Sequence, residues 1–210
     1  MSAGSAVNSC FSARAVQKNM SSLKGKLGTK VASKAVTIVD DPFLPGQSGT
    51  SSFDGEGVAT KYKEVIKEGV LKTYLHNMKT AKIDKTESTG NASRSYKSNI
   101  GVAPTNLYFT KGDMPFAELL KEMGEGIVIT EVSALHSGFN AISGDFSLPA
   151  KGYTVKNGEK EKFFRQITVS GNYFDMLKDV LAAGDDLTFG TNGNIGSPSL
   201  LISKISVAGE

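Results

Sequence analysis

Apolar side chains recur every three to four residues in three stretches of the chain, a spacing typical of amphipathic helices. The first stretch follows a serine suited to cap a helix and has Phe11, Met20 and Leu23 among its apolar positions. The second begins with a proline, which suits the first turn of a helix. The third turns an apolar face inward that includes Leu177 and Leu181. We therefore predict helices at residues 11–23, 115–123 and 173–183.

Two longer stretches are predicted to form β-hairpins, because each has two strand-like runs joined by a glycine-containing turn. In residues 57–77 the turn is Lys67-Glu68-Gly69, and in residues 144–172 it is Asn157-Gly158, a dipeptide typical of tight hairpins. The two units lie about ninety residues apart, which suggests an internal duplication. Single strands are predicted at residues 35–39, 106–109, 126–132 and 199–207.

The order of these elements indicates the fold class. Hairpins with a few interspersed helices, and without regular alternation of strand and helix, predict an α+β fold of mainly antiparallel sheets. A loop rich in Asp, Pro and Gly separates the first strand from the first hairpin. No interior segment reads as a linker, so residues 1–210 are expected to form a single domain.

Composition narrows the classes of function. The hydrophobic content of 39% is enough for a core, and 24 Lys and Arg against 21 Asp and Glu leave a net charge of +3. That charge is too small to argue for direct nucleic-acid binding. The single cysteine, Cys10, excludes an internal disulfide. With no apolar run near the roughly 20 residues of a membrane helix and no secretory signal, we expect a cytoplasmic protein without membrane contact.

The sequence offers little catalytic chemistry. Its two histidines, His76 and His136, have no histidine or cysteine at metal-ligand spacing. A Ser-His-Asp set could be assembled from His136, Ser137 and Asp145, but no GxSxG motif frames a nucleophile, and a polar loop is the simpler interpretation of His136. The lysines at positions 61, 63 and 67 are interpreted as a solvated strand face. From the residues alone, no catalytic or metal-binding residue and no cofactor is expected.

Short motifs nevertheless recur in a familiar order: SSFDGEGVATK, IKEGVLKTYL, STGNAS, GEGIVITE, NAISGDFSLPAKGY, ITVSGN and GSPSLLI. Together, from Cys10 to Glu210, they resemble the C-terminal half of the TldD/PmbA family, in particular its PmbA or TldE branch, which carries the label of DNA gyrase modulators. The family's N-terminal α/β half has no counterpart in this chain. The resemblance implies that STGNAS is the family loop that follows the first hairpin and its short helix.

The resemblance also makes an absence informative. The TldD branch is a zinc-dependent peptidase whose His-Glu-x-x-x-His helix and C-terminal cysteine supply the metal ligands. The region similar to that helix reads CFSARAVQ, from Cys10 to Gln17, and the region similar to the cysteine segment reads DLTFGTNGNIGSP. Neither contains the expected ligands. The resemblance therefore implies a subunit without a catalytic or metal site of its own.

Such a subunit is expected to pair with a TldD-like zinc peptidase, with itself as a dimer, or with both, and to help bind small unfolded peptides. An exposed sheet edge can hold an extended peptide through backbone hydrogen bonds. The candidate contact residues are Ile127, Val128, Ile129, Thr130, Glu131 and His136 for the peptide, with Phe11, Met20 and Leu23 for a partner. A fully buried core strand is the alternative for residues 127–131.

Two other functions stay open. One is a regulatory module that binds DNA gyrase or a similar partner without proteolysis, and the other is an independent hydrolase built around His136.

Overall fold

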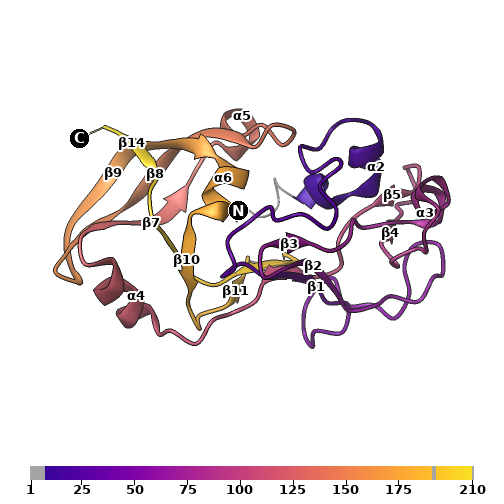
Figure 1. Ribbon diagram of the computed structural model, residues 1–210, viewed down its shortest axis with the longest axis horizontal. Helices are drawn as coiled ribbons and strands as arrows, with labels where there is room; N and C mark the ends of the chain where they lie inside the picture. Colours follow the sequence, from indigo (N-terminus) through magenta and orange to yellow (C-terminus); the bar gives the residue numbers. More distant parts are fainter. Residues whose placement is uncertain (1–7, 191–192, 210) are drawn as a thin grey trace.

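Two β-sheets form the two halves of an elongated molecule (Figure 1), and the computed structural model describes residues 8–190 and 193–209. The central sheet is antiparallel except for one parallel pair, β12 with β6. Its strands, in spatial order, are β11 (Thr188–Phe189), β12 (Ile195–Ser197), β6 (Leu107–Phe109), β1 (Ile38–Asp40), β2 (Lys63–Lys67) and β3 (Val70–Leu71).

The second sheet is antiparallel throughout and is dominated by a long curved hairpin. Its strands, in spatial order, are β14 (Ser206–Ala208), β9 (Glu159–Asn172), β8 (Asp145–Lys156) and β7 (Gly126–Val132). Two small sheets complete the set, β10 (Val180–Ala183) with β13 (Leu200–Ile202) and β4 (Ala92–Ser93) with β5 (Gly101–Val102). The α+β class with mainly antiparallel sheets is thus confirmed.

The helices are short and lie beside the sheets (Figure 1). They are the 3₁₀ helix η1 (Asn8–Phe11), α2 (Ala13–Gln17), α3 (Met78–Asp84), α4 (Phe116–Met123), α5 (Leu135–Gly138) and α6 (Tyr173–Lys178). Helix α3 begins with a capping box, in which Asn77 and Thr80 exchange side-chain and backbone hydrogen bonds. No helix among the described residues is long and apolar enough to cross a membrane.

Both predicted hairpins form, and their turns have the same geometry. Glu68 and Gly69 have φ of 46° and 80°, and Asn157 and Gly158 have φ of 53° and 76°. Two successive positive φ values are the signature of the turn that matches the twist of the flanking strands. Beyond their turns, the hairpins differ in strand length and belong to different sheets, so the structure gives the suggested duplication no further support.

Two of the predicted helices are too long. Helix α2 ends at Gln17. Asn19, two residues later, has a left-handed conformation, which does not fit within a right-handed helix. Helix α6 ends at Lys178, and residues 180–183 form β10 opposite β13, so Leu181 is 59% exposed rather than on an inner helix face. The expected final strand is likewise two strands, β13 and β14. Apolar spacing alone did not reveal these breaks.

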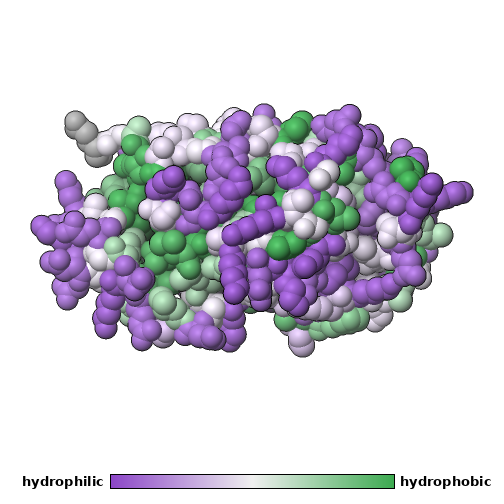
Figure 2. Space-filling view, in the orientation of Figure 1, coloured by the Kyte–Doolittle hydropathy of each residue, from purple (hydrophilic) through white to green (hydrophobic). Residues whose placement is uncertain are grey.

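The main core lies where residues 10–36 and 74–75 pack against the central sheet and α6. Phe11, Leu71, Leu75 and Leu177 are each at most 2% exposed there. A second, smaller core covers one face of the four-stranded sheet, around Leu148, Ile167 and Val169. In the space-filling view apolar side chains also reach the surface, notably in the half that holds the second sheet (Figure 2).

Candidate functional site

Strand β7 is an edge strand with one partner, β8, and its other side faces a cavity. Residues 126, 127, 128 and 129 all line that cavity. Successive side chains of a strand point to opposite faces of a sheet, so a run of four consecutive lining residues means that the strand presents its edge. Among the described residues no further strand pairs with this edge, so its backbone groups can pair with an added strand. The expected strand is therefore correct in position, but it is not fully buried.

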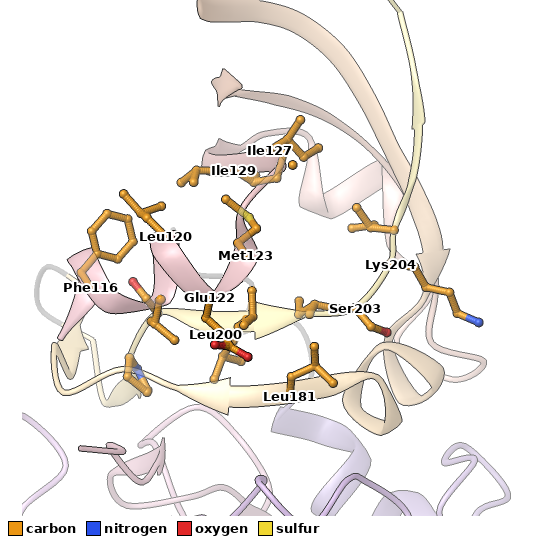
Figure 3. Close-up of a pocket in the computed structure, with 18 of the residues that line it drawn as sticks. Phe116, Leu120, Glu122, Met123, Ile127, Ile129, Leu181, Leu200, Ser203 and Lys204 are labelled. Atoms are coloured by element: carbon orange, nitrogen blue, oxygen red, sulfur yellow. The ribbon is translucent and has the colours of Figure 1, made fainter. Parts of the chain in front are cut away.

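The opposite wall of the cavity is a second strand edge. Within the part of the chain that the structure describes, β13 pairs with β10 alone, and residues 197–205 around it all line the same space. The cavity has a volume of about 780 Å³, within the roughly 300–1,000 Å³ of typical ligand sites. Figure 3 shows Ile127 and Ile129 at one side of it and Leu181 and Leu200 at the other.

Helix α4 forms the third wall. Pro115 precedes its first turn, and the helix has a strongly one-sided distribution of apolar residues, with Leu119 buried. Phe116, Leu120 and Met123 line the cavity from this helix (Figure 3). The end of the helix is tied to the hairpin turn, because the Gly158 amide donates a 2.8 Å hydrogen bond to the Gly124 carbonyl. The wall thus has a fixed place relative to β7.

The position of β7 itself is set by its contact with β8. A side chain at Gly152 would bring a Cβ within 1.8 Å of the Val128 carbonyl oxygen, so the two strands approach closely only because residue 152 is glycine. The pairing register then shifts between Ile129 and Glu131. Thr130, at this irregularity, donates its hydroxyl to the Lys151 carbonyl. Glu131 forms an exposed ion pair with Lys151 at 3.2 Å.

Charged side chains lie on the cavity walls among the apolar ones. Glu122 lies in the last turn of α4, Glu125 lies between α4 and β7, Asp186 precedes β11, and Lys204 follows β13. Partial burial raises the pKa of Asp186, but hydrogen bonds from the Ser199 hydroxyl and amide outweigh it and hold this pKa below its ordinary value. Both carboxylate oxygens of Asp186 therefore already accept hydrogen bonds from within the protein.

The other sequence candidates lie elsewhere. Phe11 and Leu23 are 2% and 1% exposed in the main core, so in this structure neither offers a surface to a partner. Of that set only Met20 is exposed, at 48%. His136 is exposed on the short helix α5 and does not line the cavity. The structure therefore brings together Ile127, Val128 and Ile129, but not Thr130, Glu131 or His136.

The suggested hydrolytic set does not assemble either. Ser137 donates its hydroxyl to the Ala134 carbonyl, and the Asp145 carboxylate accepts a 2.8 Å hydrogen bond from Asn172. In the described part of the chain, no hydrogen bond joins His136, Ser137 and Asp145. The Asn172 hydrogen bond lowers the pKa of Asp145, which leaves this carboxylate ionised and bound to an amide.

The region similar to the zinc helix of the TldD branch does not fit a metal. Cys10 is fully buried, and burial raises the pKa of its thiol well above the ordinary value, so the metal-binding thiolate is disfavoured. Helix α2 contributes no imidazole or carboxylate. Across residues 8–190 and 193–209, no group of three or more His, Cys, Asp or Glu side chains is placed to hold a metal ion.

Sequence reasoning missed a buried polar network around Asp40. This carboxylate, at 0% exposure, accepts hydrogen bonds of 2.7–2.8 Å from Lys63, Asn91 and both the amide and hydroxyl of Thr105. Lys63 was expected on a solvated face, but its side chain is only 9% exposed in this ion pair. The expectation failed because strand alternation does not show which polar side chain has a buried partner.

Asn91 also explains the motif STGNAS. Gly90 has φ of 72°, and a Cβ there would lie 2.7 Å from the Ala59 carbonyl oxygen. This close approach places Asn91 against Asp40, while the Thr89 hydroxyl bonds the backbone of His76. Through these hydrogen bonds the loop links the central sheet to the segment before α3.

Known proteins match this chain over nearly its whole length. The family model described as PmbA/TldA metallopeptidase C-terminal domain matches residues 3–209. Metalloprotease PmbA of Escherichia coli O157:H7 is 32% identical over 195 residues, which are 93% of this chain and 40% of that protein.

Solved structures agree with the sequence matches. A candidate modulator of a DNA gyrase from Thermotoga maritima has a TM-score of 0.93 and 45% identity, over 98% of this chain and 46% of that one. TldE from Thermococcus kodakarensis has a TM-score of 0.85 and 25% identity, over 97% of this chain and 46% of that one. The chain thus spans less than half the length of these relatives.

Proposed function

The chain belongs to the PmbA/TldD family through its metallopeptidase C-terminal domain, and we propose that it is a non-catalytic, TldE-like subunit that binds extended peptides beside a zinc-bearing TldD-like partner. The single observation that supports this most strongly is the unpaired edge of β7 in an apolar cavity. Strand addition depends on backbone hydrogen bonds and needs little side-chain sequence, which suits small unfolded peptides of varied sequence.

The metal-binding side chains of this chain limit the role that we propose for it. A peptidase needs a metal-bound water or another nucleophile, and the donor set of residues 10–17 does not fit a zinc ion. The proposed role of this chain is therefore to hold and align the peptide, while the partner supplies the zinc. Alignment alone can contribute substantially to a rate, because it converts an encounter into a pre-oriented reaction.

A binding experiment with backbone-modified peptides tests strand addition. An unstructured, apolar, fluorescently labelled peptide is compared with two versions N-methylated at alternate residues, one in each register. Two lost backbone hydrogen bonds, each worth about 0.5–1.5 kcal/mol, should weaken binding about tenfold in at least one register. Equal affinity of all three peptides would contradict the proposal, because N-methylation leaves the side chains unchanged.

Matched variants on α4 locate the binding site. Leu120 lines the cavity and is half-buried, whereas Ala117 is exposed on the same helix and does not line it. Leu120→Glu should abolish peptide binding because it removes an apolar side chain of the α4 wall against which the peptide would pack, and Ala117→Glu should leave the affinity unchanged. Circular dichroism of both variants checks that the fold is retained. Equal loss or equal retention of binding would place the site elsewhere.

A regulatory module acting on DNA gyrase is the second candidate function. The observation in its favour is the description of the Thermotoga maritima structure as a candidate modulator of a DNA gyrase. A change in gyrase supercoiling activity on adding the chain, together with no peptide binding, would favour this alternative.

A further inference from the structure

The cavity contains a carboxylate that the fold itself does not use. Glu122 lines the cavity from the C-terminal half of α4 (Figure 3). It takes part in no ion pair or side-chain hydrogen bond within the described ranges. Asp186, by contrast, accepts two hydrogen bonds from Ser199. The Glu125 side chain, just past the helix, has no such partner among the described residues either. Glu122 and Glu125 are therefore the cavity carboxylates available to a ligand, and Glu122 is the one on the α4 wall.

The cavity walls carry more acidic than basic side chains. Three acidic side chains line the cavity, Glu122, Glu125 and Asp186, against one basic side chain, Lys204. Lys204 lies 4.0 Å from the carboxylate of Asp179, so part of its charge is already balanced. Glu122 is exposed to water beside these apolar side chains and has no counter-charge among the described residues. A basic side chain would supply that counter-charge.

We propose that the groove between β7, β13 and α4 selects extended peptides that carry a lysine or arginine among alternating apolar residues. This inference rests on the proposed function, because it names the peptides that the β7 edge would hold. An added strand rises about 3.3 Å per residue, so the four lining residues of β7 span about 13 Å.

The side chains of an added peptide strand would alternate between the two sides of the groove. Side chains at every second peptide position would face α4, where Phe116, Leu120 and Met123 form the apolar wall. Lys and Arg have long aliphatic stems that pack on apolar surfaces while their charged ends reach outward. A basic residue on this face can therefore cover Leu120 and place its charge at Glu122.

Peptides that differ at one position test the selection. Lysine, glutamine or glutamate is placed at one of the alternating positions of an otherwise identical labelled peptide, and fluorescence anisotropy at low salt measures the three affinities. An accessible ion pair contributes up to about 1 kcal/mol, so the lysine peptide should bind more tightly than the glutamine peptide by up to about fivefold. The glutamate peptide should bind most weakly.

Protein variants assign the preference to one carboxylate. Glu122→Gln should remove the difference between the lysine and glutamine peptides, and Glu122→Lys should reverse the order in favour of glutamate. Glu118, one helical turn earlier, is exposed and does not line the cavity, so Glu118→Gln is the matched control and should keep the preference.

The outcomes separate this inference from the function on which it rests. Equal binding of all three peptides, or a preference that survives Glu122→Gln, would overturn the inference and leave peptide binding at the β7 edge in place. No binding of any peptide would overturn both. A lysine preference lost in Glu122→Gln and kept in Glu118→Gln supports the inference.

Discussion

The side chain of His76 is buried just before α3. It is 4% exposed, and its Nδ1 atom has no hydrogen-bond partner among residues 8–190 and 193–209. Burial lowers the pKa of His76 below its ordinary value of 6.5, although the carboxylate of Asp84 opposes that shift. At neutral pH the folded protein therefore holds His76 as the neutral imidazole.

The stability of the protein should accordingly fall in mild acid. The neutral imidazole contributes its full stability above pH 6.5, the ordinary value, and this contribution is lost as the pH falls through the lower folded-state pKa. Urea unfolding at pH 7.5 and 5.5 measures the loss. His76→Gln should remove most of it, whereas His136→Gln, at the exposed histidine, should not. An unchanged pH dependence in His76→Gln would contradict this assignment.

The ion pair of Asp40 and Lys63 should matter more to stability than any exposed pair. Asp40→Ala leaves a lysine of 9% side-chain exposure without its carboxylate, and breaking such a buried pair costs about 3–5 kcal/mol. Glu131→Ala breaks an exposed pair with Lys151 and should cost at most about 1 kcal/mol. Denaturant unfolding compares the two. Similar losses would contradict the structural role of Asp40.

At the scale of elements, local chemistry predicted much of the fold. The two glycine turns, α4 and β7 lie where the sequence places them, because their signals are local: a left-handed turn pair, a proline at a helix start and an apolar run. The predicted helix at 11–23 failed because Leu23 is buried by tertiary contacts of a loop, which spacing cannot distinguish from a helix face.

Local sequence patterns were equally limited in predicting the site. Residues 126–132 could be identified as a strand, but its place at a sheet edge depends on which strands pair, and those partners are distant in sequence. The cavity adds α4 and β13, about eighty residues apart, and no local pattern indicates that they face each other. Asp40 and Asn91, 51 positions apart, are hidden from sequence patterns for the same reason.

The first hairpin turn allows backbone strain and steric contact to be measured separately. Gly69 has φ of +80°, and an added Cβ would lie 2.4 Å from the Ala32 carbonyl oxygen. Gly25 has φ of +74°, with nothing within 4 Å of such an atom. Gly25→Ala should therefore cost only the conformational strain of about 1 kcal/mol, and Gly69→Ala about 1–3 kcal/mol more. Equal costs would show that the hairpin shifts to relieve the contact.

On the scale of the whole molecule, the structure separates a stable frame from a binding edge. The main core and the Asp40 network hold the central sheet, while the unpaired edges of β7 and β13 lie in the other half, around the cavity. The family relatives are more than twice as long as this chain, and one carries the name of a metalloprotease. Peptide holding and zinc chemistry are therefore proposed to reside on different subunits.

Hydrolysis of an unstructured peptide, measured with and without a TldD-like zinc peptidase, tests this division most directly. The chain is first dialysed against a chelator and then supplied with zinc. We expect no hydrolysis by the chain alone, and a higher rate of hydrolysis by the TldD-like subunit when this chain is added, with that increase lost in Leu120→Glu. Zinc-dependent hydrolysis by the chain alone, or a rate unaffected by its addition, would contradict the account.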